Sequence, residues 1–310
     1  MDISNGWNWS SASTRDRDPG PASARRRCLM RLQGARRVFD RLDWWDVNAW
    51  EGSALWSFCD EGAALLLVPL DLSPDDALDA TRAATAWVRW CAVADDGKAP
   101  ACLRRVFDEA EARLAAHGVR EVWCIVRSFD WLRPYLRERG YRPAGRLLTF
   151  QVELERAVEA PPLPAGLWLR PAHAGDFDVV CGLDAVAFDE PWRYPPALMR
   201  PAFERSFAVT VAACADGIVG YACSLLHQAN GHIVRLAVHP SLRLRGIGAG
   251  LLMDSVARLR QAGAQAVSLN TQSDNRAAQR LYRRLGFALL DEKPAVLRKP
   301  IAPAADGGAT

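Results

Sequence analysis

The chain has 310 residues, of which 50% are hydrophobic and 24% charged, and its formal net charge at pH 7 is only +3. These values are typical of a globular protein, and the length suffices for two ordinary domains. The near balance of charge gives no reason to expect a nucleic-acid or membrane partner, so an acidic ligand would need a local basic site.

The first 30 residues differ in composition from the rest of the chain. They are rich in Ser, Asp, Arg, Gly and Pro and show no hydrophobic periodicity, so we expect a disordered tail over residues 1–30. Their arginines are not followed by the apolar stretch of a signal peptide or membrane anchor. We therefore expect a cytoplasmic protein.

A proline-rich stretch near the middle of the chain predicts a domain boundary. Residues 158–165 read Val-Glu-Ala-Pro-Pro-Leu-Pro-Ala, and such a stretch favours an extended spacer over a helix. We expect one domain over residues 31–157, a linker over 158–165, a second domain over 166–300 and a flexible tail over 301–310.

Strand and helix patterns alternate in the second half of the chain. Two runs rich in Val, Ile and Ala flank Asp216-Gly217, a strong hairpin signal, so these runs should pair antiparallel. Hydrophobic periodicity predicts the other elements. The expected strands are 167–170, 208–215, 218–226, 232–238, 266–271 and a last one from 287, and the expected helices are 176–188, 246–262 and 275–285. This order indicates an α/β fold with a mixed sheet.

Features of the first half recur in the second half. A shift of about 145 residues brings Ala112-Arg113-Leu114 onto Ala257-Arg258-Leu259 and Gly118 onto Gly263. We infer that the chain holds two copies of one fold in tandem.

The segment before the helix predicted at 246–262 suits a phosphate group. The first N–H groups of a helix have no intrahelical partner, and the helix dipole adds positive potential there. Gly246 and Gly248 let a pyrophosphate approach the backbone, and Arg243 and Arg245 add positive charge. The same residues can equally form an ordinary turn, so the loop alone leaves both interpretations open.

Asn275 and Tyr282 lie two turns apart on one face of the next predicted helix, so both can face one ligand. Taken singly, Asn275 is better explained as a helix N-cap and Tyr282 as a core aromatic. Their order after the loop and before Gly286-Phe287 favours a shared function.

Three motifs together resemble the signature of the GNAT superfamily of N-acetyltransferases. They are Val238-x-Pro240, Arg243-x-x-Gly246-x-Gly248 and Asn275-x-x-Ala278-x-x-Leu281-Tyr282-x-x-x-Gly286-Phe287. The resemblance covers nearly all of the second half and implies two tandem GNAT-like domains. Leu244 departs from the pattern, because many members have a second glycine directly after the arginine.

The resemblance implies that acetyl-CoA is the co-substrate and that its acetyl group is transferred directly to a primary amine of a small molecule or a protein N-terminus. In the family, two adjacent strands splay apart, and main-chain N–H groups polarise the thioester carbonyl in the gap. Tyr282 would be the general acid that protonates the leaving thiolate. The residues implied to bind acetyl-CoA are Leu236, Ala237, Val238, Arg243, Leu244, Arg245, Gly246, Ile247, Gly248, Ala249 and Asn275.

The general base is open. In enzymes that resemble the ribosomal-protein alanine N-acetyltransferases, a glutamate lies on the strand before the asparagine, but Asn270 stands there and cannot act as a base. His232 is a possible base by residue type, although a lone histidine is more often a packing residue. Glu190 is a second possible base, because its segment resembles one that shapes the acceptor pocket. Glu204 acting through water is a third.

The first half lacks the corresponding loop. The same shift places that loop at 98–103, where Ala101 and Leu103 replace the glycines, and Leu136 stands in place of the tyrosine. We therefore expect a degenerate GNAT-like domain that packs beside the catalytic one, a layout that also resembles mycothiol synthase. Its tryptophans should form core and interdomain surface; they are Trp44, Trp45, Trp50, Trp56, Trp87, Trp90, Trp123 and Trp131.

Other ligand classes and functions are less well supported. The eight cysteines include no Cys-x-x-Cys pair and no histidine at ligand spacing, so we expect no metal. Gly-x-Gly-x-x-Gly on a strand–helix–strand unit and Gly-Lys-Ser/Thr are both missing, which argues against NAD and ATP. The alternative function is a catalytically silent acetyl-CoA-binding regulatory module, because no firm base or acceptor site is recognisable.

Overall fold

The computed structural model describes residues 32, 35, 37–40, 56–60, 62–69, 85–94, 99–155 and 162–303. The tail predicted over 1–30, the first half of the predicted linker and residues 304–310 lie outside the described residues. Within the described ranges, no helix is both long and apolar enough to cross a membrane.

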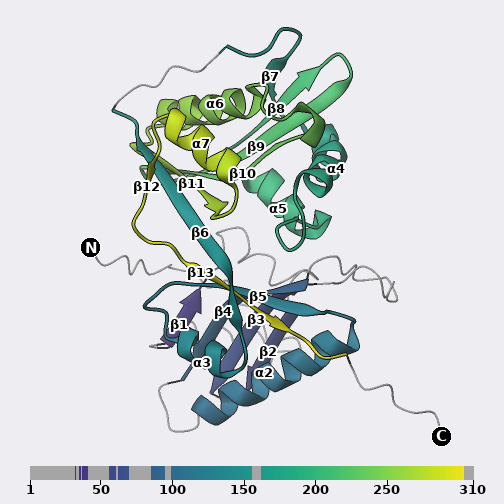
Figure 1. The fold of residues 1–310 in the computed structure, drawn as a ribbon, viewed down its shortest axis with the longest axis vertical. Helices are drawn as coiled ribbons and strands as arrows, with labels where there is room; N and C mark the ends of the chain where they lie inside the picture. The colour runs from purple at the N-terminus through teal and green to yellow at the C-terminus, as the bar shows by residue number, and fades with distance from the viewer. Residues whose placement is uncertain are drawn as a thin grey trace, which may run out of the picture.

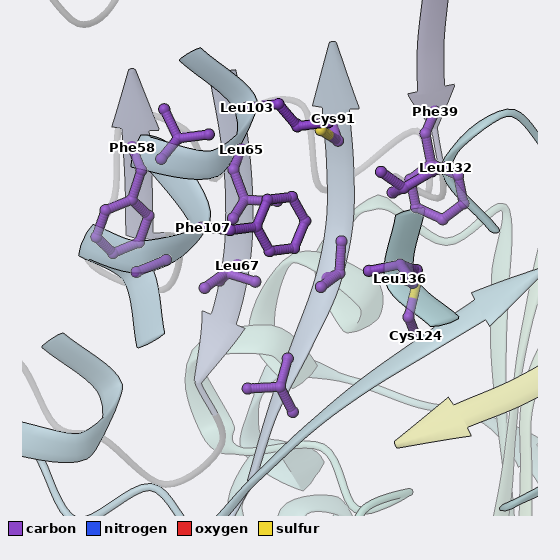
Figure 2. Packing of buried hydrophobic residues seen from close by; sticks show 14 of the residues in the cluster. Phe39, Phe58, Leu65, Leu67, Cys91, Leu103, Phe107, Cys124, Leu132 and Leu136 are labelled. Atoms are coloured by element: carbon purple, nitrogen blue, oxygen red, sulfur yellow. The ribbon is translucent and has the colours of Figure 1, made fainter. Parts of the chain in front are cut away.

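The first half is a sheet covered on one face by two helices (Figure 1). Helix α2 packs its Leu103 and Phe107 over Leu65, and α3 contributes Leu132 and Leu136 to the same core (Figure 2). The elements are β1 (Arg37–Asp40), β2 (Trp56–Asp60), β3 (Ala63–Pro69), β4 (Thr85–Val93), α2 (Ala99–Ala116), β5 (Glu121–Val126) and α3 (Leu132–Glu138).

The rest of the chain contains the elements predicted for the second half together with others that were not predicted. They are β6 (Arg142–Glu153), β7 (Trp168–Pro171), η2 (Ala174–Asp176), α4 (Phe177–Ala187), α5 (Pro196–Arg205), β8 (Ala208–Cys214), β9 (Gly217–His227), β10 (Asn230–Val238), η3 (Pro240–Leu242), α6 (Ile247–Gln261), β11 (Ala266–Gln272), α7 (Arg276–Arg284), β12 (Ala288–Leu289) and β13 (Ala295–Pro300). Strand β6, helix α5, strand β13 and the two short 3₁₀ helices η2 and η3 had no predicted counterpart, and the strand predicted from Phe287 is only the two-residue β12.

The side chains of β8 and β9 point alternately to the two faces of the sheet of the second half, and each face packs against a helix. Val211 and Tyr221 face α4 in one cluster, whereas Ala212 and Ala222 face Ile247 of α6 in another. Successive side chains of a strand point to opposite faces, so both faces of this sheet are buried. The result is the α/β fold expected from the sequence.

The two halves repeat the same unit, as the sequence predicted. The shift of about 145 residues places the bounds of β4 on those of β10. Both strands pair in parallel with the next strand in the same register, since Thr85 faces Glu121 and Asn230 faces Ala266. An α-helix connects the two strands in each half, as a parallel pair requires.

The two halves also exchange strands, which the predicted division at 158–165 did not anticipate. The beginning of β6 pairs with β13, and its remainder, residues 147–153, pairs with β11 of the second half. Strand β13 comes from the end of the predicted second domain, yet it lies between β5 and β6 in the sheet of the first half (Figure 1). The hydrogen bonding of the strands therefore crosses the predicted domain boundaries, because pairing between distant segments leaves no local pattern.

Because β13 packs into the core of the first half, we expect the stability of the first half to depend on this strand. Leu297 is 2% exposed and lies in the core of the first half. Leu297→Ala should lower the free energy of unfolding by about 2–5 kcal/mol, because it removes buried methyl groups and leaves a cavity. Urea denaturation followed by tryptophan fluorescence measures the change. Leu290→Ala is the matched control, because Leu290 is 37% exposed; equal effects of the two substitutions would refute the prediction.

Candidate active site

A cavity of about 1320 Å³ follows the ends of β10 and β11 and reaches both halves of the chain. Small-molecule sites usually measure about 300–1,000 Å³, so this cavity has room for a long ligand together with a second molecule. Its walls include the segment 188–194, the loop before α6 and the start of α7. The first half contributes Trp87, Arg89, Ile125 and Arg127.

Strands β10 and β11 separate inside this cavity. Their parallel pairing runs from Asn230–Ala266 to Ile233–Leu269 and then stops, although β10 continues to Val238. A bulge in the pairing of β10 with β9 lies at the same place, and bulges bend a strand. Peptide groups of residues 234–238 that face β11 therefore have no strand partner among the described strands. Leu236, Ala237 and Val238 line the cavity here, where the sequence placed them.

The loop before α6 has the backbone that glycine favours. Gly246 precedes the helix with a φ of +88°, and Leu244 has a φ of +65° while 92% exposed. A left-handed conformation costs a non-glycine residue roughly 1–2 kcal/mol. Leu244 thus occupies, under strain, the position where the family pattern has glycine.

The beginning of α6 offers free N–H groups to the cavity. The first i to i−4 hydrogen bond at this end is donated by Gly250 to the Gly246 carbonyl, so the N–H groups of the first turn have no partner within the helix. The cavity-lining residues of the predicted loop are Arg243, Leu244, Gly246, Ile247, Gly248 and Ala249. Arg245, which was also predicted, does not line the cavity.

The positive charge of the site comes partly from residues that the sequence analysis did not name. Arg243 lines the cavity, but its Nη2 donates to the Ala187 carbonyl at 2.6 Å and so ties the loop to the end of α4. Arg280 and Arg284 of α7 also line the cavity. Their spacing of one helical turn puts them on one face of α7, and this signal was present in the sequence.

Asn275 and Tyr282 both line the cavity. Asn275 is at the same time the N-cap of α7, since its Oδ1 accepts the Ala278 N–H at 3.1 Å. Tyr282 is 6% exposed and packs edge-on against Phe150. Burial raises the pKa of Tyr282, so its hydroxyl is protonated throughout the neutral range.

His232 lies just before the point where β10 and β11 separate. Its Nδ1 is 2.9 Å from the Ser268 hydroxyl on β11, and the residue lines the cavity. Burial lowers the pKa of His232 to about 4, so the imidazole is neutral at pH 7. Asn270, on β11, accepts a hydrogen bond from the Thr149 hydroxyl at 2.8 Å.

The structure does not bring Glu190 into the cavity. Its carboxylate accepts a hydrogen bond from Arg193 at 2.9 Å, while its neighbours Asp189 and Pro191 line the cavity. The predicted segment is therefore at the site, but the predicted residue points elsewhere, because no periodicity orients side chains in an irregular segment. Glu204 pairs with Arg200 and also lies outside the cavity lining.

The first half has the repeated fold without the loop. Helix α2 begins at Ala99, so Ala101 and Leu103 lie inside the helix, and Leu103 is part of the core. Trp87 contacts Trp123 and Trp192, at ring-centroid distances of 5.9 and 5.1 Å.

These tryptophans therefore form an aromatic contact between the halves, as expected for interdomain surface. Trp90 is buried, and Trp131 packs against the core of the first half. Trp44, Trp45 and Trp50 lie outside the described residues, and so does the side chain of Trp56.

Comparison with known protein families and curated proteins agrees with this geometry. Residues 180–287 match the family model described as acetyltransferase (GNAT) family. Mycothiol acetyltransferase of Actinosynnema mirum is 28% identical over 189 residues, 57% of this chain and 54% of that protein. The enzyme of the same name from Saccharomonospora viridis is 28% identical over 211 residues, 58% of this chain and 68% of that protein. The chain thus spans about half to two thirds of the length of these relatives.

Solved structures share the fold at low sequence identity. A GCN5-related N-acetyltransferase from Sphaerobacter thermophilus has a TM-score of 0.55 and 21% identity, covering 86% of this chain and 87% of its own. A tandem GNAT protein from the clavulanic acid biosynthesis pathway has a TM-score of 0.59 and 15% identity, covering 89% and 94%. The resemblance carried by the motifs is thereby supported: residues 180–287 match the GNAT acetyltransferase family model, and the chain shares the fold of a tandem GNAT protein.

Proposed function

We propose that this protein is an N-acetyltransferase that transfers the acetyl group of acetyl-CoA directly to a primary amine. The observation that carries the proposal is the separation of β10 from β11 beside the N-terminus of α6, within one cavity. A CoA thioester has a pyrophosphate that suits a helix N-terminus and an amide-rich arm that suits unpaired strand backbone.

The residues of this chain fit such a ligand at both ends. The N–H groups at Gly246, Ile247 and Gly248 would hold the pyrophosphate, with positive charge from Arg280 and Arg284. The free backbone of residues 236–238 would hold the arm, with help from Asn275. No side chain intervenes at Gly246 or Gly248, so the phosphates can approach the main chain.

Transfer requires that the amine nitrogen bonds to the acetyl carbon, that the carbon–sulfur bond breaks, and that one proton leaves the amine while another reaches the thiolate. Backbone N–H groups at the separation of the strands stabilise the negative charge that develops on the carbonyl oxygen. Tyr282, whose hydroxyl carries its proton at neutral pH, donates that proton to the thiolate in this proposal.

For the base we propose His232 over Glu190, since His232 lines the cavity and Glu190 does not. Its Nδ1 is engaged by Ser268, which leaves Nε2 to accept the proton. The low pKa of the ring keeps the imidazole neutral at pH 7, so Nε2 is unprotonated.

The acceptor is bound, in this proposal, where the cavity reaches the first half. Trp87, Arg89 and Ile125 of the first half line the cavity there, and Trp192 and Tyr194 line it beside them, in the same hydrophobic cluster as Trp87. A site enclosed by both halves favours a small-molecule amine over a protein N-terminus. The curated relatives are named mycothiol acetyltransferases, which makes a mycothiol-related amine the first class to test.

Thiol release from acetyl-CoA across a panel of amines tests the function. The panel comprises mycothiol-related amines, amino sugars, amino acids, polyamines and peptides with a free N-terminus. We expect turnover with at least one small-molecule amine, and Tyr282→Phe should lower kcat for it by about 100-fold or more, because general acid catalysis contributes that much. The acetyl-CoA Kd should hardly change, since phenylalanine retains the packing on Phe150. Tight acetyl-CoA binding with no turnover on any amine would instead favour the regulatory module.

Alanine substitutions of two glycines at opposite ends of α6 can distinguish an effect on acetyl-CoA binding from an effect on stability. Gly246 before the helix and Gly263 after it have φ values of +88° and +90°, and an added Cβ meets nothing within 4 Å at either position. Alanine should therefore destabilise the protein similarly at both, by about 1–2 kcal/mol. Calorimetry should show a rise of about tenfold in the acetyl-CoA Kd for Gly246→Ala alone. Equal Kd values for the two variants would exclude Gly246 from the site.

The pKa of His232 predicts how stability depends on pH. Below pH 6.5 the unfolded chain binds a proton that the folded protein does not accept until about pH 4, so the free energy of unfolding falls as the pH drops through this window. The fall amounts to about 1.4 kcal/mol per pH unit. His232→Gln removes this contribution. Between pH 7 and 4.5, the free energy of unfolding of the variant should therefore fall by about 2–3 kcal/mol less than that of the wild type, as measured by urea denaturation. A parallel loss in both proteins would contradict the prediction.

A further inference from the structure

A buried ion pair lies beside the cavity where β10 leaves β11. Arg235 Nε and Nη2 donate to Oδ2 and Oδ1 of Asp184 at 2.7 and 2.9 Å. Asp184, on α4, is fully buried, and Arg235 is 9% exposed. Arg235 is the first paired residue of β10 after the bulge at Ile233, and it lines the cavity.

Both members of the pair also hold the segment 188–194, which forms one wall of the cavity. The Arg235 guanidinium donates to the Trp192 carbonyl at 2.8 Å. It lies 3.7 and 4.0 Å from the ring centroids of Phe188 and Tyr194, within the range of cation–π attraction. Asp184 accepts the Tyr194 N–H at 2.9 Å. The segment is thus attached to β10 and α4 through backbone and side chains together.

The carboxylate of Asp184 is fully engaged. Each oxygen accepts one bond from Arg235 and a second from another donor, Tyr194 N–H for Oδ1 and the Tyr221 hydroxyl for Oδ2. Burial raises the pKa of Tyr221, which keeps its hydroxyl a donor. Burial opposes the charge of Arg235, but Tyr221 and Asp184 outweigh it and raise the pKa. Asp184 therefore has no free lone pair with which to act as a base.

The first half holds the same segment from the other side. Trp87 Nε1 donates to the Pro191 carbonyl at 2.8 Å, and the Trp87 and Trp192 rings are 5.1 Å apart. The segment 188–194 is thus fixed between the ion pair and the first half.

We propose that Asp184 and Arg235 are a positioning pair, which holds the segment 188–194 at the separation of β10 and β11 so that the acceptor amine is aligned with the acetyl group. This inference rests on the proposed acetyltransfer. In this proposal the pair controls how tightly the acceptor binds and how it is aligned. Neither residue contacts the reacting atoms.

The test replaces both charges at once with apolar side chains of similar size, Asp184→Leu with Arg235→Met. Such replacements of a buried ion pair usually preserve folding, whereas removal of one partner leaves an uncompensated charge. Hydrogen exchange over residues 188–194, followed by mass spectrometry, should accelerate at least tenfold, while exchange in α6 stays at the wild-type rate. The KM of the fastest amine in the panel should rise at least tenfold, and the acetyl-CoA Kd should change by less than threefold.

A second ion pair in the same half supplies the matched control. Arg170 donates to both oxygens of Asp176 at 2.7 and 2.9 Å, and neither residue lines the cavity. The double substitution Asp176→Leu with Arg170→Met should leave exchange over 188–194 and the amine KM at wild-type values.

Two results would overturn the proposal. One is wild-type exchange over 188–194 in the Asp184/Arg235 variant, and the other is an equal effect of both double variants, which would reveal a contribution to stability alone. The exchange measurement needs no acceptor, so it decides the positioning role even when no amine in the panel is acetylated.

Discussion

Two parallel strands that stop pairing in mid-course leave peptide groups that neither strand can satisfy. In this protein β10 keeps its partner β9 throughout but leaves β11 after Ile233, and the bulge before Arg235 turns the strand at that point. The cavity, the loop before α6 and His232 all lie around this opening. Buried strand backbone without a hydrogen-bond partner is unfavourable unless a ligand or water pairs with it. The separation therefore destabilises the sheet, and it also favours a ligand whose polar groups can pair with the free peptide groups.

The opening depends on a frame that spans both halves. Strand β6 crosses from one sheet to the other, and β13 returns from the second half into the first (Figure 1). Halves joined by backbone hydrogen bonds cannot hinge freely, as domains connected only by a linker do. The contact between the segment 188–194 and Trp87 at this end of the cavity is therefore held in place by the strands that join the halves.

Much of this arrangement follows from local sequence. Periodicity and the Asp216-Gly217 turn located most strands and helices of the second half, and Asn275 and Tyr282, which their spacing puts on one helical face, both line the cavity. The remainder depends on distant contacts. The pairing of β13 with β5 leaves no mark on either segment, and Arg235 looks like an ordinary polar residue until α4 brings Asp184 against it. Glu190 was predicted as a possible base but does not line the cavity, because the direction of a side chain in an irregular segment is set by tertiary packing.

The place of β13 between β5 and β6 has a consequence for the order in which the protein is made. The ribosome synthesises the chain from the N-terminus, so the first half emerges long before residues 295–300 have been added. Until then β5 and β6 lack the strand that belongs between them, and open strand edges invite pairing with other chains. Synthesis therefore passes through a nascent state in which the first half is incomplete until β13 has been translated.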